Sequence, residues 1–307
     1  MRNPSYCRMD FVQEVISMDE ATRIVRFKVK PDPRRYEIID RDGIRCYRDK
    51  YLDDIIPENV LREAFLKSAG IPVYSDPPTI GNALEYAANR RDAVEAELKT
   101  GVFTPPESKA DAHHTLHLDD SGRYLTFLSV DICGSTKLRV RDEEAFDRAY
   151  KIFVQELGTV VGQFHGTILT LTGDGFIAYL DHPSINTQCD NAIDMGLTFI
   201  AILETGINPA LELAKLPTIS IRVGADHGIA IQAAYNIPTT GFSDLSVRSD
   251  ALNRCVKIQG EAGDNQLLIG RELYERLHVQ WLERCVEQKI KIAKKLGFDE
   301  YPVYSVK

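Results

Sequence analysis

The sequence contains no apolar run long enough to cross a membrane. No stretch approaches the ~18–20 consecutive apolar residues of a transmembrane helix. The opening residues, MRNPSYCRMD, are too polar for a secretory signal. We therefore expect a cytoplasmic protein without a membrane partner.

The chain also has fewer basic than acidic residues. The chain of 307 residues has 37 Lys and Arg against 45 Asp and Glu, a formal net charge of −8. Such a chain does not attract nucleic acid or an anionic membrane over a broad surface. We expect no nucleic-acid partner, and a polyanionic small ligand would need cations placed locally.

Paired cysteines and complete metal-binding repeats are missing as well. The six cysteines are dispersed without a CxxC pair, which predicts reduced and mostly buried thiols. His113, His114 and His117 have metal-like spacing, but they follow a proline-containing stretch and no fourth ligand lies nearby. A solvated linker is the preferred interpretation.

What is present is an ordinary globular composition, with 44% hydrophobic and 27% charged residues. The length suggests about two domains. Residues 104–122 are polar and contain proline, so they predict a connection. We divide the chain into an N-terminal accessory region at 1–110, a linker at 111–122 and a C-terminal domain at 123–307.

The accessory region has the pattern of a small α+β unit. β-branched segments at 24–29 and 36–39, with turn residues at 41–43, predict a hairpin. A helix is expected from Pro57 to Gly70. Apolar residues from Ile80 to Leu98 follow an alternating 4/3 spacing, which suits either a dimer-bracing seam or packing on the adjacent domain.

The C-terminal domain has the pattern of a split sheet. Predicted strands lie at 123–132, 166–172, 176–180, 218–224 and 229–234, and amphipathic helices begin after Asp142 and at 185–203. Up to residue 224 this order is βαββαβ, the ferredoxin-like arrangement with helices on one face. The fold class we predict is α+β.

Two acidic residues occupy positions that are unusual for solvated surface side chains. Asp131 ends a strand of apolar residues, and Asp174 occupies the tight Gly173-Asp174-Gly175 turn of the next hairpin. In this sheet order the two positions can converge, and converging carboxylates repel unless a cation lies between them. Mg²⁺ or Mn²⁺, held by few carboxylates and by substrate phosphates, fits that chemistry.

The loop after Asp131 adds a weaker indication. Gly134, Ser135 and Thr136 follow a strand and precede a helical segment, so their backbone N–H groups can face phosphate oxygens. The chain has neither a GxxxxGK[ST] phosphate-binding loop nor a complete dinucleotide-binding fingerprint.

Several segments together resemble the class III adenylate and guanylate cyclase catalytic domain. They are FLSVDICGSTKL (127–138), LTLTGDGFIAYL (169–180), IRVGADHG (221–228), DALNRCVKIQGEA (250–262) and NQLLIG (265–270). The similarity covers about residues 120–306.

This resemblance implies a role for each matching residue. Asp131, Asp174 and the Ile132 carbonyl would bind two metal ions, one at the ribose 3′-hydroxyl and one at the triphosphate. Asn253 would orient the ribose. Lys257 stands where the family usually carries an arginine on the α-phosphate, and lysine offers a point charge in place of a planar fork. Lys295, or its neighbour Lys294, would contact the terminal phosphates.

The resemblance also implies a homodimer with two shared sites. In the family, the metal-binding aspartates come from one protomer, and the asparagine and the transition-state cation come from its partner. A monomer would be inactive.

The purine-selecting pair of the family is missing. The two base-reading positions are Thr170 and Ser246, which carry small uncharged hydroxyls. The protein resembles the pyrimidine cyclases of Pycsar antiphage systems, whose product activates a separate effector. We expect conversion of UTP to cyclic UMP, ahead of CTP to cyclic CMP. The alternatives are an adenylate cyclase with unusual base contacts and an inactive nucleotide-binding module.

Overall fold

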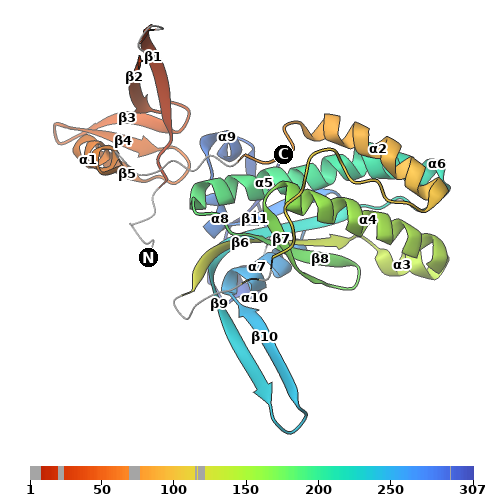
Figure 1. Cartoon of the computed structure of the whole chain (residues 1–307). Helices are drawn as coiled ribbons and strands as arrows, with labels where there is room; N and C mark the ends of the chain where they lie inside the picture. The colour runs from red at the N-terminus through yellow and green to blue at the C-terminus, as the bar shows by residue number, and fades with distance from the viewer. Residues whose placement is uncertain (1–7, 20–23, 69–76, 115, 117–121, 291) are drawn as a thin grey trace. The chain divides into compact units, whose positions relative to one another are not determined.

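The computed structural model describes residues 8–19, 24–68, 77–114, 116, 122–290 and 292–307. The chain divides into two compact units (Figure 1). The N-terminal unit comprises Met1–Ser75 with Glu275–Glu283, and the C-terminal unit comprises Asp76–Tyr274 with Arg284–Lys307. This division does not follow the boundaries that we drew from the sequence at 110 and 122.

The N-terminal unit consists of two small antiparallel sheets and two helices. Its elements are β1 (Phe11–Asp19) paired with β2 (Ile24–Pro31), the sheet β3 (Tyr36–Arg41), β4 (Ile44–Asp49) and β5 (Ile55–Pro57), and the helices α1 (Glu58–Ser68) and α9 (Val279–Leu282). The predicted turn at 41–43 joins β3 to β4, with Asp42 at φ 55° and Gly43 at φ 76°. The partner of β2 is β1, a strand that the sequence analysis did not predict.

A buried arginine ties residues 275–283 into the N-terminal unit. The Arg35 guanidinium is fully buried and forms ion pairs with Asp10 at 2.9 Å and Asp49 at 2.7 Å. It also donates to the Leu277 carbonyl at 3.2 Å, and the Val279 N–H donates to Asp10 at 2.9 Å. This contact spans about 240 residues of sequence, so local patterning does not reveal it.

The C-terminal unit is built on one sheet with strand order β12-β13-β11-β9-β6-β8-β7, and β10 pairs with β9. Its strands are β6 (Arg123–Ile132), β7 (Gly166–Leu171), β8 (Gly175–Leu180), β9 (Ile221–Ile237), β10 (Phe242–Arg248), β11 (Gln266–Gly270), β12 (Cys285–Gln288) and β13 (Val303–Val306). The central order β9-β6-β8-β7 is that of a ferredoxin-like sheet, which confirms the predicted fold class.

Helices cover both faces of this sheet (Figure 1). The helices among the described residues of this unit are α2 (Ala83–Thr100), α3 (Ser135–Arg141), α4 (Glu143–Gln163), α5 (Ile185–Ile202), the π-helix η2 (Leu203–Ile207), α6 (Asn208–Leu213), α7 (Asp250–Gln259), α8 (Arg271–Tyr274) and α10 (Ala293–Leu296). Side chains of β6 alternate between the faces: Phe127 packs in a cluster with Cys255 of α7, whereas Leu128 lies against Gly196 of α5. We expected helices on one face alone. This holds for α4 and α5, but α7 lies on the opposite face.

The helix with the 4/3 apolar spacing packs within the C-terminal unit. Its seam residues Ala87 and Val94 are buried against α5, η2 and α6. Arg90, on the same helix, forms a buried bidentate ion pair with Glu156 of α4 at 2.7 Å. Packing on the adjacent domain, one of the two interpretations of the spacing, is thus what the structure shows.

The two strands predicted at 218–224 and 229–234 form one continuous strand, β9, and that prediction was wrong. Neither Gly224 nor Gly228, which lie at and after the predicted strand end, has a positive φ. A Cβ at Gly224 would lie 2.3 Å from the backbone nitrogen of Gln259, so this glycine permits the close approach of α7. Beyond the sheet, β9 and β10 continue as a long hairpin (Figure 1).

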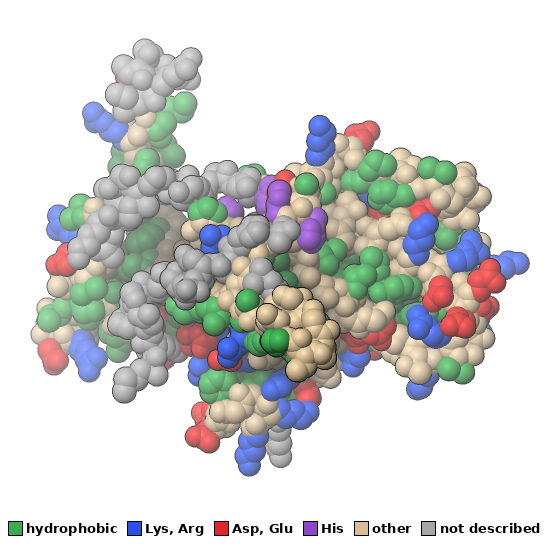
Figure 2. Space-filling view, turned by 60° about the horizontal axis from the view of Figure 1, so that its bottom comes forward, with side chains coloured by type: hydrophobic (Ala, Val, Ile, Leu, Met, Phe, Trp, Pro, Cys, Tyr) green, Lys and Arg blue, Asp and Glu red, His purple; other side chains and the backbone are tan. Residues whose placement is uncertain are grey.

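The remaining sequence predictions concern thiols, histidines and membranes. Cys46, Cys189 and Cys255 are free and buried, and Cys133 and Cys285 are free and half-buried. His117 lies outside the described residues. Over the part of the chain that the structure describes, no helix is both long enough and apolar enough to traverse a bilayer. Figure 2 shows acidic and basic side chains interspersed over the drawn face.

Candidate active site

The strand pairing of the sheet brings Asp131 and Asp174 together. Asp131 is the penultimate residue of β6 and pairs with Gly175, the first residue of β8, so Asp174 in the preceding turn lies beside it. The Ile132 N–H donates to the Asp174 carbonyl at 3.2 Å. A Cβ at Gly175 would lie 2.0 Å from the Val130 carbonyl oxygen, so the close approach of these two strand ends requires glycine there.

Each of the two carboxyl groups affects the protonation of the other. Burial and a hydrogen bond to the Asp174 carboxyl raise the pKa of Asp131, and Arg222 acts in the opposite direction. Burial also acts to raise the pKa of Asp174, but hydrogen bonds from Ser135 and from Asp131 outweigh it, so this pKa is lowered. One carboxyl of the pair thus favours protonation when no cation is present.

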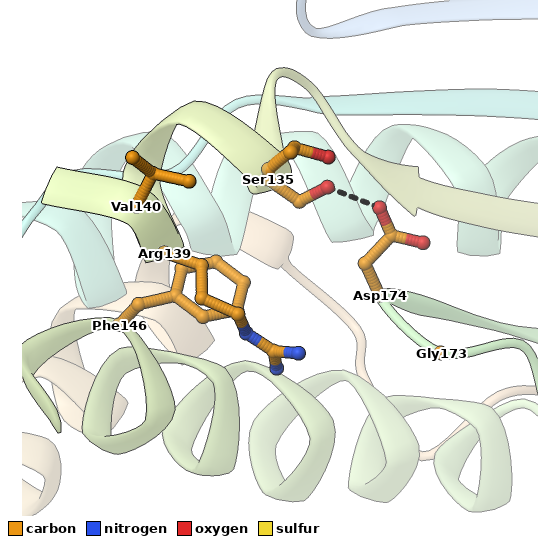
Figure 3. A pocket seen from close by; sticks show the side chains of 7 residues that line it. Ser135, Arg139, Val140, Phe146, Gly173 and Asp174 are labelled. Atoms are coloured by element: carbon orange, nitrogen blue, oxygen red, sulfur yellow. Dashed lines mark hydrogen bonds between the residues drawn. The ribbon is translucent and has the colours of Figure 1, made fainter. Parts of the chain in front are cut away.

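Three neighbouring groups donate to the acidic pair. The Arg222 guanidinium donates to Asp131, and the Gln259 amide donates to the same oxygen at 3.4 Å. The Ser135 hydroxyl donates to Asp174 (Figure 3). Two carboxylates therefore face a single guanidinium, and an ionised pair keeps an excess negative charge.

This donor set fits a hard divalent cation. Two carboxylates and the Ile132 carbonyl are the oxygen ligands that Mg²⁺ and Mn²⁺ prefer, and Mg²⁺ is held by few carboxylates together with substrate phosphates. The described residues include no group of three or more His, Cys, Asp or Glu side chains suited to a metal.

The loop predicted to face phosphate lies beside Asp174. Gly134 is exposed and adopts φ 65°, a conformation that favours glycine, and Ser135 and Thr136 begin α3. Both hydroxyl residues line a cavity of about 340 Å³ next to Asp174. The structure thus brings together Asp131, Ile132, Gly134, Ser135, Thr136 and Asp174.

A second, fully buried acidic centre anchors α7 to the same sheet. Asp226 of β9 accepts hydrogen bonds from the Arg254 guanidinium, from the Tyr301 hydroxyl at 2.6 Å and from the His227 N–H at 2.9 Å. Burial raises the pKa of Asp226, and Arg254 and Tyr301 oppose that shift. A Cβ at Gly270 would lie 2.7 Å from the Asp226 carboxyl carbon, so glycine leaves room for this centre.

Similarity to known proteins helps to interpret this geometry. No family model matches the chain. A cytidylate cyclase of Escherichia coli is 25% identical over 256 residues, which is 79% of this chain and 50% of that protein. The chain thus spans about half the length of this curated relative.

Two solved structures with the same fold match this chain over most of their own length. The guanylyl cyclase Cya2 matches with a TM-score of 0.52 at 17% identity, over 62% of this chain and 94% of that one. The adenylyl cyclase CyaB from P. aeruginosa matches with a TM-score of 0.52 at 20% identity, over 60% and 93%.

The chain has the class III nucleotidyl cyclase fold. It combines this catalytic fold with additional small sheets at its N-terminus. The two structural neighbours are described as acting on different purine nucleotides, so the fold does not by itself specify the base.

The residues expected to serve the partner's site lie on α7 and near the end of the chain. Asn253 and Lys257 are exposed on α7. The Lys257 ammonium donates to the Lys295 carbonyl at 2.9 Å, and the Lys295 ammonium forms an ion pair with Glu261. The structure therefore brings Lys257 and Lys295 together.

The two base-reading positions lie on different strands of the cyclase sheet. Thr170 is exposed on β7 beside a register irregularity, and its hydroxyl donates to the Leu171 carbonyl at 3.2 Å. Ser246 is half-buried on β10 and pairs with Ala233 of β9. Both hydroxyls are small, and neither side chain carries a charge.

Sequence reasoning missed the groups that donate to the acidic centres. Arg222 lies directly opposite Asp131 in the β6–β9 register, and opposite charges at facing positions of antiparallel strands are a recognised signal. That signal required a known register. The partners of Asp226, which are Arg254 and Tyr301, are distant in the sequence and leave no local pattern.

Proposed function

We propose that the chain is a pyrimidine nucleotide cyclase that converts CTP to 3′,5′-cyclic CMP and pyrophosphate. The observation that carries this proposal is the pair Asp131 and Asp174 at adjoining strand ends of a class III fold, where Arg222 donates to one of the two carboxyl groups. A degenerate binding module has no need to keep two mutually repelling carboxylates there.

The choice of CTP rests on the relative. The sequence led us to expect UTP ahead of CTP, whereas the curated relative that covers 79% of the chain is a cytidylate cyclase. Thr170 and Ser246 offer hydroxyls that can donate or accept, so they suit cytosine N4–H and N3 as well as the uracil edge. Neither supplies the charged or acidic group that would select a purine in this family.

The acidic pair would hold the metal. Bound to Asp131, Asp174 and the Ile132 carbonyl, Mg²⁺ or Mn²⁺ would lower the pKa of the ribose 3′-hydroxyl and neutralise triphosphate charge. Ser135, Arg222 and Gln259 fix the two carboxylates by hydrogen bonds, so the ligand oxygens are oriented before the substrate arrives.

Residues of α7 would act on the sugar and the reacting phosphate. Asn253 orients the ribose, and Lys257 places a positive charge at the α-phosphate. The 3′-oxygen forms a bond to the α-phosphorus while the bond to the β-phosphate oxygen breaks, and the hydroxyl proton passes to solvent. Lys295 adds charge for the terminal phosphates.

The sites would be shared between two copies of the chain. Asn253 and Lys257 are exposed, as residues that serve a partner must be. We expect Asp174→Asn and Asn253→Ala chains to be inactive separately and to regain activity when mixed, because mixed dimers rebuild one complete site. Failure of the mixture to recover turnover, with dimers verified by light scattering, would refute sharing.

A competition assay tests the proposed reaction. Purified chain with Mn²⁺ and equal amounts of ATP, GTP, CTP and UTP is expected to form cyclic CMP as its main product, identified by mass spectrometry. The Asp174→Asn variant serves as the inactive control. Main turnover of UTP would restore our sequence-based choice, and main turnover of a purine would reject a pyrimidine cyclase.

We also propose that the cyclic nucleotide is a second messenger for a separate effector in antiphage defence, as the Pycsar resemblance implies. Cyclic CMP is then expected to accumulate when phage infect bacteria that carry this chain. An unchanged cyclic CMP level on infection would contradict this role.

A further inference from the structure

The cavity beside Asp174 contains an arginine for which the proposed reaction has not yet given a role. Its walls are formed by the loop before β8, by α3 and by the start of α4 (Figure 3). The lining residues are Ser135, Thr136, Arg139, Val140, Phe146, Gly173 and Asp174. Arg139 is the only lysine or arginine among these lining residues.

Packing holds the Arg139 guanidinium in place. Its central carbon lies 5.1 Å from the centre of the Phe146 ring, within the range of a cation–π contact. Phe146 is buried and stacks on Tyr150 with ring centres 6.1 Å apart, so neighbouring side chains hold the ring that contacts the guanidinium. Figure 3 shows the Arg139 side chain lying against Phe146, with Asp174 across the cavity from them.

Arg139 and Asp174 line the same cavity. Their charges act in opposite directions on the pKa of Tyr150, which burial and Asp174 raise and Arg139 lowers.

The ion pair that Arg139 makes is a weak one. Its partner is Asp147 at 3.3 Å, and both side chains are at least half exposed. Such surface pairs contribute ~0–1 kcal/mol, so a ligand can replace Asp147 at little cost. By contrast, Arg222 donates to Asp131.

The chemistry of the cavity favours a phosphate-bearing ligand. An arginine fork and the hydroxyls of Ser135 and Thr136 are donors for phosphate oxygens, and the planar fork can bind two oxygens at once. A cation on Asp174 would draw the same oxygens toward this cavity. A carboxylate or a nucleobase could bind the guanidinium, but it would not bind the guanidinium, the two hydroxyls and the cation together.

We propose that Arg139 binds the β- and γ-phosphates of the substrate and then the leaving pyrophosphate. This inference rests on the proposed cyclase function and adds to it a phosphate-binding residue on the same protomer as the aspartates. It also shows where an acidic chain places a cation for a polyanionic substrate. Negative charge grows on the pyrophosphate as its bond to the α-phosphate breaks, so the interaction strengthens along the reaction.

Binding of pyrophosphate with Mn²⁺ to the full-length chain tests this directly, by isothermal titration calorimetry. We expect Arg139→Gln to weaken binding about 10- to 100-fold, as for loss of a charge-assisted hydrogen bond, and Arg139→Lys to weaken it less. Arg141→Gln is the matched control, since Arg141 is exposed on the same helix outside the cavity. Melting temperatures verify that each variant is folded.

Because this measurement needs no turnover, its failure is distinguishable from failure of the cyclase proposal. Wild-type binding that Arg139→Gln leaves unchanged would overturn the role of Arg139 even if CTP is cyclised. Absence of pyrophosphate binding to the wild type would also overturn it. Arg139-dependent binding in a chain that cyclises no nucleotide would support the phosphate site and reject the cyclase.

Discussion

Two acidic centres lie on one sheet and differ in how their charge is balanced. At the buried centre, Asp226 is fully inaccessible, and Arg254, Tyr301 and the His227 N–H all donate to it. At the open centre, Asp131 and Asp174 are partly accessible, and within the described ranges a single guanidinium, that of Arg222, donates to them.

The difference separates structural from functional carboxylates. A buried charge is tolerated when it is paired and hydrogen-bonded, and the pairing then holds elements together. Here Asp226 attaches α7 to β9. Two adjacent carboxylates that share one guanidinium destabilise each other when both are ionised. We propose that a metal ion balances them.

The largest effect we expect is the loss of turnover at the open centre. Asp174→Asn should lower nucleotide cyclisation at least about 1000-fold, because it removes a metal ligand that supplies several kcal/mol of charge stabilisation. Its melting temperature should stay close to that of the wild type, since the asparagine amide oxygen can still accept the hydrogen bond from Ser135. Turnover assays and thermal melting measure both quantities.

Asp181→Asn is the matched control for this variant, because Asp181 forms an ion pair with the half-exposed Arg123 away from the site. It should retain activity. If Asp174→Asn loses stability as well as activity, Asp174 is structural and the contrast between the two centres is invalid.

The buried centre should show the opposite behaviour. Arg254→Leu leaves the Asp226 carboxylate buried without its cation, which should lower the free energy of unfolding by about 3–5 kcal/mol. Urea denaturation measures this change. The exposed Arg248→Leu is the control and should change stability by no more than about 0.5 kcal/mol. Equal stability of the two variants would show that Arg254 does not balance Asp226.

A smaller effect is expected from the space around Asp226. Gly270→Ala places a Cβ 2.7 Å from a carboxyl carbon that three hydrogen bonds hold in place, so it should cost about 1–3 kcal/mol. At Gly260 the nearest atom to a new Cβ lies 3.5 Å away, and Gly260→Ala should be neutral. Urea midpoints that fall equally for both would argue against crowding at Asp226.

Short-range patterns were sufficient for the core of the C-terminal unit. Alternation and turn residues predicted β6, β7 and β8 within one or two residues, and Asp142 caps α4 as expected. The convergence of Asp131 and Asp174 followed from sheet order alone. These features depend on neighbours in the sequence or on a common topology.

Features that depend on distant contacts could not be predicted in the same way. Gly224 was mistaken for a strand end because its role is to admit α7, which follows some 30 residues later. The insertion of residues 275–283 into the N-terminal unit depends on the buried Arg35. The base cannot be inferred from Thr170 and Ser246, since hydroxyls both donate and accept.

The most direct test of the contrast between the two centres is thermal melting with and without Mn²⁺. At about 100 times its dissociation constant, Mn²⁺ should stabilise the wild type by ~2.7 kcal/mol, and this gain should vanish in Asp174→Asn but persist in Gly270→Ala. A Mn²⁺ gain of equal size in the wild type and in Asp174→Asn, or no gain in the wild type, would contradict a metal site at Asp131 and Asp174.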